Sequence, residues 1–379
     1  MRRMWKWGAV LAALLAAGIL LSRDPIPGWE KAEGLAHQRS IQREILRAAA
    51  LLDDTAGADE NEERLMEAGC PAIDTDAVYP EYLANSEVLR AFAEGERDSV
   101  GIFRIPEGGG LRYLCFQRKG EDVWFFTADL YWDGKGKLYV RDTAFQPVYD
   151  LELADWDIFY YRLYPAGDPH YIDYTQIRLT SPDREMYDLA RKYILPVGYQ
   201  MVNLFLVDWQ EGDWGKLSFA DLLEALYTME TGQSLPWEDF PQKGEPVRRM
   251  IPAALFEETI LPYFAVTRED LREICGYDEE LDAYPWRPVH GNDLTTWKYP
   301  MCEPEVVSTR DNGDGTLTLQ VQVYSPELKT DRLFCHEVTV RHLEGARFQY
   351  VGNRVTDVSD RGLPPNMARF DLDQPAAVQ

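Results

Sequence analysis

The sequence predicts an α+β protein with an N-terminal transmembrane helix, an antiparallel β meander with helices, and a C-terminal unit of a helix pair and a four-stranded antiparallel sheet. Three patterns indicate this class. Residues 1–22 join a basic start to an apolar run, and residues 100–164 hold aromatic and β-branched segments separated by turn residues. Residues 316–323 alternate between polar and apolar side chains, which is typical of a strand with one buried face.

The first segment, residues 1–22, is predicted to be a signal anchor. Basic residues precede an apolar run from Gly8 to Leu21, so the positive-inside rule places the N-terminus in the cytoplasm and the rest of the chain outside. Leu20 stands where a signal peptidase requires a small residue. We therefore expect a single-pass protein of the cell membrane, with secretion after cleavage as the alternative.

The charge and the cysteines limit the partners of the chain. A formal net charge of −25 disfavours nucleic acid and anionic lipid headgroups, because both are negatively charged. Five cysteines without CxxC spacing indicate neither a closed disulfide framework nor a cysteine zinc site. We expect no cofactor, no metal and no nucleic-acid partner, and contact with the membrane through the N-terminal helix.

Residues 23–76 are predicted to form a juxtamembrane helix and an acidic spacer. Ser40 can cap a helix whose apolar stripe ends at Leu52. The run from Asp53 to Glu63 is acidic and almost free of large apolar side chains, so it should not bury enough surface to become ordered. We therefore expect a flexible spacer here.

Residues 77–245 are predicted to form an aromatic-rich α+β domain. A short helix should begin at Ser86, and the meander should follow because its segments favour strands. These segments are 100–105, 111–118, 123–132, 137–145 and 158–164. A helix that ends at Pro196, a buried strand at 201–207 and a helix from Ser218 to Gly232 complete the domain.

Residues 246–358 are predicted to form the C-terminal α+β domain, and residues 359–379 a flexible tail. The boundary is placed in the proline-containing segment 234–247, which shows no periodicity. A helix from Pro252 to Leu261 and a second one capped by Thr267 should precede the sheet. Its four strands are expected at 305–309, 316–324, 332–342 and 348–355.

Five stretches of the chain are similar to an uncharacterised family of membrane-anchored or exported proteins of Gram-positive bacteria, defined by a domain of unknown function. The stretches are Lys192–Trp209 (KYILPVGYQMVNLFLVDW), Leu255–Phe264 (LFEETILPYF), Cys275–Trp286 (CGYDEELDAYPW), Thr330–Arg341 (TDRLFCHEVTVR) and Phe348–Val355 (FQYVGNRV). The resemblance covers most of residues 79–355. It implies a location and a general class, but no activity, cofactor or catalytic residue.

Two places are candidate ligand-binding sites. Asp155, Trp156 and Asp157, followed by Tyr160, could bind a sugar, because aromatic rings stack on pyranose faces and carboxylates accept hydrogen bonds from hydroxyl groups. A strand with its aromatic side chains in the core is the alternative. His290 lies in a loop beside an acid and could act as a general base, or be an ordinary exposed histidine. No residue is assigned a catalytic role.

The leading functional hypothesis is a non-enzymatic binding or interaction module of the cell envelope. It would contact another envelope protein or a surface component, and the chain lacks the nucleophile, zinc and nucleotide motifs of familiar enzymes. One alternative is a cell-wall glycan-binding or glycan-hydrolysing protein that uses residues 155–164. The other is a small-ligand receptor with a pocket between helix and sheet in the C-terminal unit.

Overall fold

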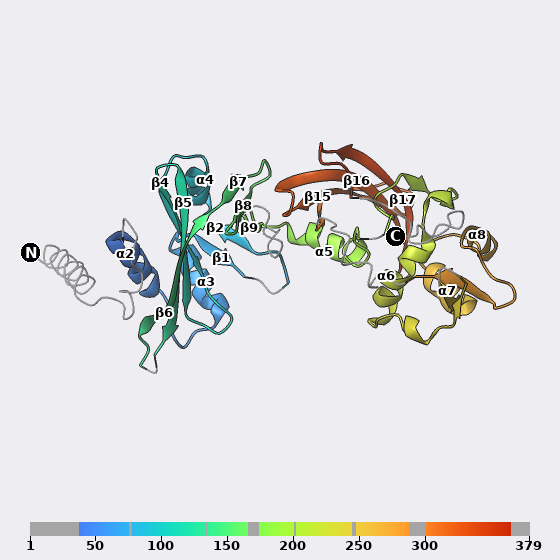
Figure 1. Ribbon diagram of the computed structural model, residues 1–379, viewed down its shortest axis with the longest axis horizontal. Helices are drawn as coiled ribbons and strands as arrows, with labels where there is room; N and C mark the ends of the chain where they lie inside the picture. Colours follow the sequence, from blue (N-terminus) through green and yellow to red (C-terminus); the bar gives the residue numbers. More distant parts are fainter. Residues whose placement is uncertain are drawn as a thin grey trace, which may run out of the picture. The chain divides into compact units, whose positions relative to one another are not determined.

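The computed structural model describes residues 38–364 apart from 76–77, 134, 166–173, 201, 245–247 and 288–300 (Figure 1). The chain divides into two compact units, Met1–Pro182 (unit 1) and Asp183–Gln379 (unit 2). The boundary predicted at residues 245 and 246 falls inside unit 2. The predicted transmembrane helix at residues 1–22 lies outside the described residues. Among the helices that the structure describes, none combines the length and the apolar character needed to cross a membrane.

The predicted α+β class is wrong, because the protein is mostly β. Strands hold 39% of the described residues and helices 24%. Short strands that were not predicted contribute to the difference, because their residues are too few to show an alternating pattern. They include β1 (Ala72–Asp74), β2 (Tyr82–Ala84), β10 (Trp209–Gln210) and β11 (Gln242–Lys243). Their partners elsewhere in the chain, rather than local sequence, determine where such strands form.

Unit 1 is built on a nine-stranded sheet in the order β6-β5-β4-β3-β1-β2-β9-β8-β7 (Figure 1). Its remaining strands are β3 (Ser99–Arg104), β4 (Leu111–Lys119), β5 (Asp122–Trp132), β6 (Leu138–Val148), β7 (Asp150–Leu153), β8 (Ile158–Arg162) and β9 (Thr175–Arg178). Strands β3 to β6 overlap the predicted segments and pair antiparallel in chain order. Parallel pairing of β1 with β3 and of β2 with β9 makes the sheet mixed, which the meander prediction missed.

The sheet of unit 1 curls until its two halves share one core. Its end strands β6 and β7 are consecutive in the chain, and only Tyr149 separates them. On the inner side, the ring centroid of Phe116 on β4 lies 5.4 Å from that of Phe159 and 5.0 Å from that of Tyr161. Both partners are on β8. Helix α4 (Glu87–Ala93) packs on this side through Leu89.

Helices α2 (Gln38–Ala49) and α3 (Ala58–Glu67) cover the other face of the sheet. Ile41 and Ile45 of α2 pack there with Leu65 of α3 against strand residues that include Phe103 and Phe126. The apolar stripe that predicted α2 therefore marks the side that contacts the sheet. This face holds the candidate site described below.

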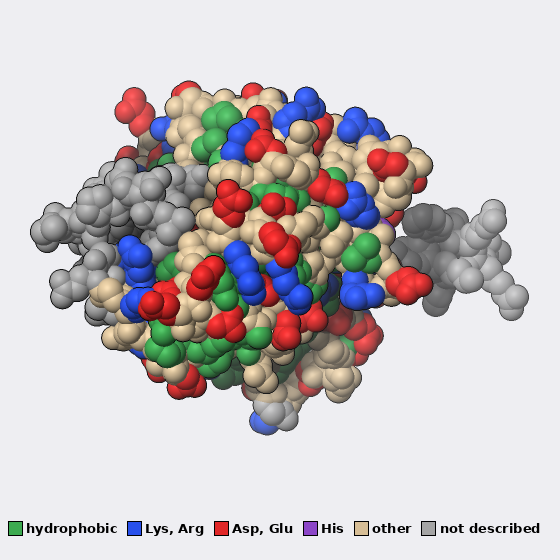
Figure 2. Space-filling model, turned by 90° about the vertical axis from the view of Figure 1, so that its right-hand side faces the viewer, with side chains coloured by type: hydrophobic (Ala, Val, Ile, Leu, Met, Phe, Trp, Pro, Cys, Tyr) green, Lys and Arg blue, Asp and Glu red, His purple; other side chains and the backbone are tan. Residues whose placement is uncertain are grey.

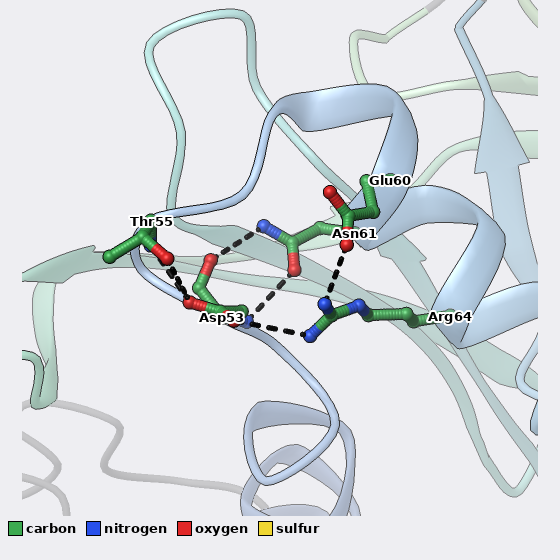
Figure 3. A network of polar contacts seen from close by, with 5 residues as sticks. All are labelled: Asp53, Thr55, Glu60, Asn61 and Arg64. Atoms are coloured by element: carbon green, nitrogen blue, oxygen red, sulfur yellow. Dashed lines mark hydrogen bonds and ion pairs between the residues drawn. The ribbon is translucent and has the colours of Figure 1, made fainter.

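The acidic segment Asp53–Glu63 is ordered, contrary to the predicted flexible spacer. The backbone N–H of Asp53 donates to Asn61 Oδ1 at 2.9 Å, and Asn61 Nδ2 donates to the Asp53 carbonyl at 3.0 Å (Figure 3). Arg64 lies 2.6 Å from Glu60 and 3.7 Å from Asp53, and Thr55 donates its N–H and hydroxyl to the Asp53 carboxylate. Local polar bonds thus order a segment that offers little apolar surface.

Unit 2 contains a five-stranded antiparallel sheet in the order β10-β17-β16-β15-β14, one strand more than predicted. Its other strands are β14 (Glu303–Asp311), β15 (Thr316–Ser325), β16 (Thr330–His342) and β17 (Phe348–Val358). A second sheet pairs β11, β12 (Arg248–Pro252) and β13 (Ala283–Trp286). The α-helices are α5 (Arg184–Tyr193), α6 (Phe219–Thr231), α7 (Ala253–Ile260) and α8 (Arg268–Ile274). One core joins α6 and α7 to the five-stranded sheet.

Of the segment predicted as a buried strand at 201–207, the described residues 202–207 form a buried turn instead. Side chains supply the hydrogen bonds that a strand partner would have supplied. Asn203 donates from Nδ2 to the Lys216 carbonyl at 2.7 Å and accepts from the Ser218 N–H at 3.1 Å. Trp209 Nε1 donates to the Leu204 carbonyl at 2.8 Å. The apolar composition of this segment therefore predicted its burial correctly, but the predicted strand was wrong.

Candidate functional site

The residues predicted to bind a sugar do not form a platform. Asp155, Trp156 and Asp157 lie in the connection between β7 and β8, where Asp157 has a φ of 69° and pairs with Arg90 at 2.6 Å. Trp156 is 41% exposed, but Tyr160 is completely buried, so its ring cannot stack on a sugar. His290 lies outside the described residues. The buried Tyr160 therefore does not join the exposed Trp156 in one binding surface.

A cavity of about 250 Å³ lies in unit 1 among α2, the loop before β1, helix α4 with its connection to β3, and strands β3 and β4. Its polar lining consists of Glu44, Arg97, Ser99, Tyr113, Cys115 and Gln117, and its remaining lining residues are Ile41, Gly69, Pro71, Val88, Val100 and Gly101. Two of these lining side chains are charged. The cavity therefore combines a few polar groups with apolar walls, as ligand sites in proteins commonly do.

Glu44 reaches the cavity from the sheet-facing side of α2. It is one residue before Ile45 and three after Ile41, whose side chains both pack on the sheet. The hydroxyl of Tyr113 on β4 donates to Glu44 Oε2 at 2.8 Å and orients the carboxylate. Burial raises the pKa of Tyr113 well above its ordinary value, so the phenol stays a neutral donor.

Gly101 makes room for the Tyr113 ring. A Cβ atom on Gly101 would lie 2.6 Å from Cε2 and 2.7 Å from Cζ of Tyr113, which is closer than real contacts allow. Gly101 and Cys115 are register partners on β3 and β4, and Tyr113 is two residues before Cys115. The glycine thus lets the tyrosine lie across β3 and reach Glu44.

Gln117 lines the cavity and carries a buried acceptor that has no hydrogen-bond partner among the described residues. The residue is only 3% exposed, and its Oε1 atom is buried without a hydrogen-bond partner among the described residues. A buried polar atom without a partner costs about 1–3 kcal/mol. A ligand that donates a hydrogen bond would remove this cost.

The thiol in the cavity is not activated for chemistry. Burial, together with the nearby Glu44 carboxylate, raises the pKa of Cys115 to about 12. A thiol is a nucleophile in its deprotonated form, so Cys115 is a poor one at neutral pH. Tyr113 and Cys115 therefore both stay neutral at neutral pH.

We predict that Gly101→Ala destabilises unit 1 by about 1–3 kcal/mol, the usual cost of an extra methyl group in a packed core. The added Cβ would push Tyr113 away from Glu44, and urea denaturation measures the loss. Gly108→Ala is the matched control, because a Cβ there meets nothing within 4 Å. Equal stability of the two variants would contradict the packing described for Gly101.

Unit 2 contains a buried histidine network that the sequence reasoning did not assign. The Tyr199 hydroxyl lies 2.9 Å from His336 Nε2, and His336 Nδ1 lies 2.7 Å from Asn353 Oδ1. Because Asn353 Nδ2 donates to the Val207 carbonyl, its Oδ1 is the acceptor, and the proton of His336 is on Nδ1. Burial lowers the pKa of His336 to about 4. The histidine is therefore neutral and enclosed.

A second buried group in unit 2 is the carboxylate of Glu257 on α7. It accepts from Tyr284 at 3.0 Å and from Arg272 at 3.0 Å, and it lies 3.1 Å from Arg268. Two guanidinium groups and a phenol thus satisfy the carboxylate within the protein. This cluster joins α7 to α8 and β13, so its contacts are those of a structural ion pair.

Charged side chains of both signs are interspersed over the face of the molecule in Figure 2. Several arginines pair with acids at the surface, such as Arg112 with Asp129 at 2.5 Å and Arg354 with Glu337 at 2.9 Å. Such exposed pairs contribute little to stability. On this face the excess of acidic residues does not form a separate patch, which is consistent with a role in solubility.

Residues 32–369 match a family described as "Family of unknown function (DUF6070)". The five stretches on which the sequence resemblance rests all lie within the matched residues. No curated protein and no solved structure matches the chain. The match extends over both units.

Proposed function

Because the chain belongs to the DUF6070 family, whose function is unknown, we propose a role from the geometry of its own residues. The protein is a non-enzymatic binding module of the cell envelope, and unit 1 recognises a small polar ligand in its cavity. The observation that carries this proposal is the buried Oε1 of the cavity-lining residue Gln117, which has no hydrogen-bond partner in the part of the chain that the structure describes. A protein gains nothing in stability from such an atom, whereas a binding site gains specificity from it.

Binding is favoured over catalysis by the state of the reactive groups. The pKa of Cys115 is raised to about 12, and that of His336 is lowered to about 4 within a closed network. Neither value suits a group that must exchange protons near neutral pH. Among the alternatives of the sequence analysis, the small-ligand receptor therefore fits best, with its pocket in unit 1 rather than in the C-terminal unit.

A thermal-shift panel tests the binding role with small ammonium compounds, carboxylates, polyols and amides on the full-length protein. At least one class should raise the melting temperature of the wild type and leave Gln117→Leu unchanged. The leucine variant should fold, because it replaces an unpartnered buried polar atom with an apolar one. Gln233→Leu makes the same change at an exposed position in unit 2 and should respond like the wild type. A panel without any shift, or an equal shift in Gln117→Leu, would refute the binding role.

We further propose that the folded units act outside the cytoplasm and that residues 1–22 direct them there. The basic start and the apolar run of this segment support the proposal. Cell fractionation combined with protease added to intact cells tests it. Membrane-bound protein that the protease degrades is expected, and protein released into the medium would indicate cleavage. Protease-resistant protein in the cytoplasmic fraction would contradict export.

A further inference from the structure

We infer that the cavity of unit 1 binds a small organic amine through its ammonium group. The inference rests on the proposed binding role and specifies the ligand class. It combines three features of the described residues: a carboxylate with one oxygen available, a buried amide oxygen without a partner, and apolar walls beside them.

Glu44 and Gln117 provide the hydrogen-bond acceptors. Tyr113 donates to Glu44 Oε2 at 2.8 Å, and none of the described residues donates to the other oxygen, Oε1. Gln117 Oε1 is also without a partner in this part of the chain. An ammonium group has three donors and no acceptor. It can therefore donate hydrogen bonds to both oxygens, and it presents no lone pair that the oxygens would repel. A carboxylate ligand would meet two acceptors and be rejected.

The charge of the lining around Glu44 and Gln117 suits a ligand with one positive charge. Cys115 stays protonated because its pKa is raised to about 12, and Tyr113 is a neutral donor, so Glu44 supplies the one negative charge of the lining. The other charged lining residue, Arg97, is exposed to solvent. Calcium takes six to eight oxygen ligands, so one carboxylate and one amide do not suit a hard metal ion.

The walls and the volume favour an organic ligand rather than a bare ion. Ile41, Pro71, Val88 and Val100 line the cavity and can contact a carbon body. A cavity of about 150 Å³ in another protein accommodates benzene. The 250 Å³ found here therefore suits a molecule somewhat larger than benzene.

Isothermal titration of the full-length protein with benzylammonium, benzyl alcohol and benzoate at neutral pH tests the ligand class. The three compounds share one ring and differ in charge. Benzylammonium should bind about tenfold or more tightly than benzyl alcohol, as expected for hydrogen bonds to a charged group. Benzoate should not bind measurably.

Variants of the acceptors sharpen the test. Glu44→Gln should abolish the advantage of benzylammonium over benzyl alcohol, whereas Glu60→Gln, at an exposed acid of α3, should keep it. Should Glu44→Gln fail to fold, Gln117→Leu provides the test and should lower the affinity for benzylammonium about tenfold.

The outcomes separate this inference from the binding role. Equal affinities for benzylammonium and benzyl alcohol, or an undiminished preference in Glu44→Gln, would overturn the ammonium assignment while other ligands of the panel could still bind. If no compound of any class binds, both the inference and the proposed function fail.

Discussion

Phe116→Ala is expected to destabilise unit 1 by about 3–5 kcal/mol, the range for removing a buried aromatic side chain. Phe116 is completely buried, and its ring lies 4.9 Å from Phe125, 5.0 Å from Tyr161 and 6.0 Å from Phe92. These neighbours come from β5, β8 and α4, so one substitution removes contacts between the two halves of the curled sheet and its covering helix. The midpoint of urea denaturation measures the effect.

A control at the surface separates packing from a general loss of aromatic area. Tyr149 is 50% exposed and joins the end strands β6 and β7. Tyr149→Ala should cost about 0.5 kcal/mol or less, as exposed substitutions usually do. A loss for Phe116→Ala that is no larger than that for Tyr149→Ala would show that β4 does not face β8 across a shared core.

The stability of unit 2 should fall by about 3 kcal/mol as the pH drops from 7 to below 4, on account of His336 alone. Burial lowers the pKa of His336 from its ordinary value of 6.5 to about 4 in the folded protein. Between these values the unfolded chain binds the proton more readily, so acid favours unfolding. The contribution is complete above pH 6.5 and is lost as the pH falls towards 4.

Hydrogen exchange of the β16 and β17 amides at several pH values measures this loss within unit 2. His336→Gln should be less stable at pH 7, because it disturbs the bonds to Tyr199 and Asn353, but it should lose less stability on acidification. His342→Gln, at an exposed position, should keep the wild-type drop. Parallel pH profiles of the wild type and His336→Gln would contradict the buried, neutral state of His336.

The long elements could be predicted from the sequence because each carries its own periodic signal. The sequence of β15 alternates between polar and apolar side chains and the strand forms as predicted, but its polar face is not solvated, because Thr316, Thr318 and Gln322 are buried as well. The stripes of α5 and α6 repeat at helical spacing. Thr267 was also correctly assigned as a helix cap, since it accepts from the Asp270 N–H. These signals are local, so no knowledge of the rest of the chain was needed.

The overall class could not be predicted, because tertiary partners decide it. The sheet of unit 1 is mixed because β1 pairs parallel with β3 and β2 pairs parallel with β9. Strands β1 and β2 have three residues each, which is too short to show an alternating pattern. The acidic spacer was misjudged for a similar reason. Its composition predicted disorder because the segment has little apolar surface. Hydrogen bonds between the side chain of Asn61 and the N–H and carbonyl groups of Asp53 order it instead.

The candidate site was missed although one signal for it is in the sequence. Glu44 is a carboxylate on the apolar stripe of a helix, next to Ile45, and such a residue needs a buried partner or a function. The sugar-binding prediction at Asp155–Tyr164 rested on composition instead. An aromatic-rich strand does not reveal from its sequence that Tyr160 is buried. Gln117 gave no signal, because only the packing around it leaves its oxygen without a partner.

A crystal structure of the full-length protein soaked with benzylammonium tests the central claim most directly. We expect the amine in the unit 1 cavity, with its nitrogen about 2.7–3.2 Å from both Gln117 Oε1 and Glu44 Oε1. A soaked crystal in which the cavity holds no amine, or in which the amine lies with its nitrogen away from both oxygens, would contradict it.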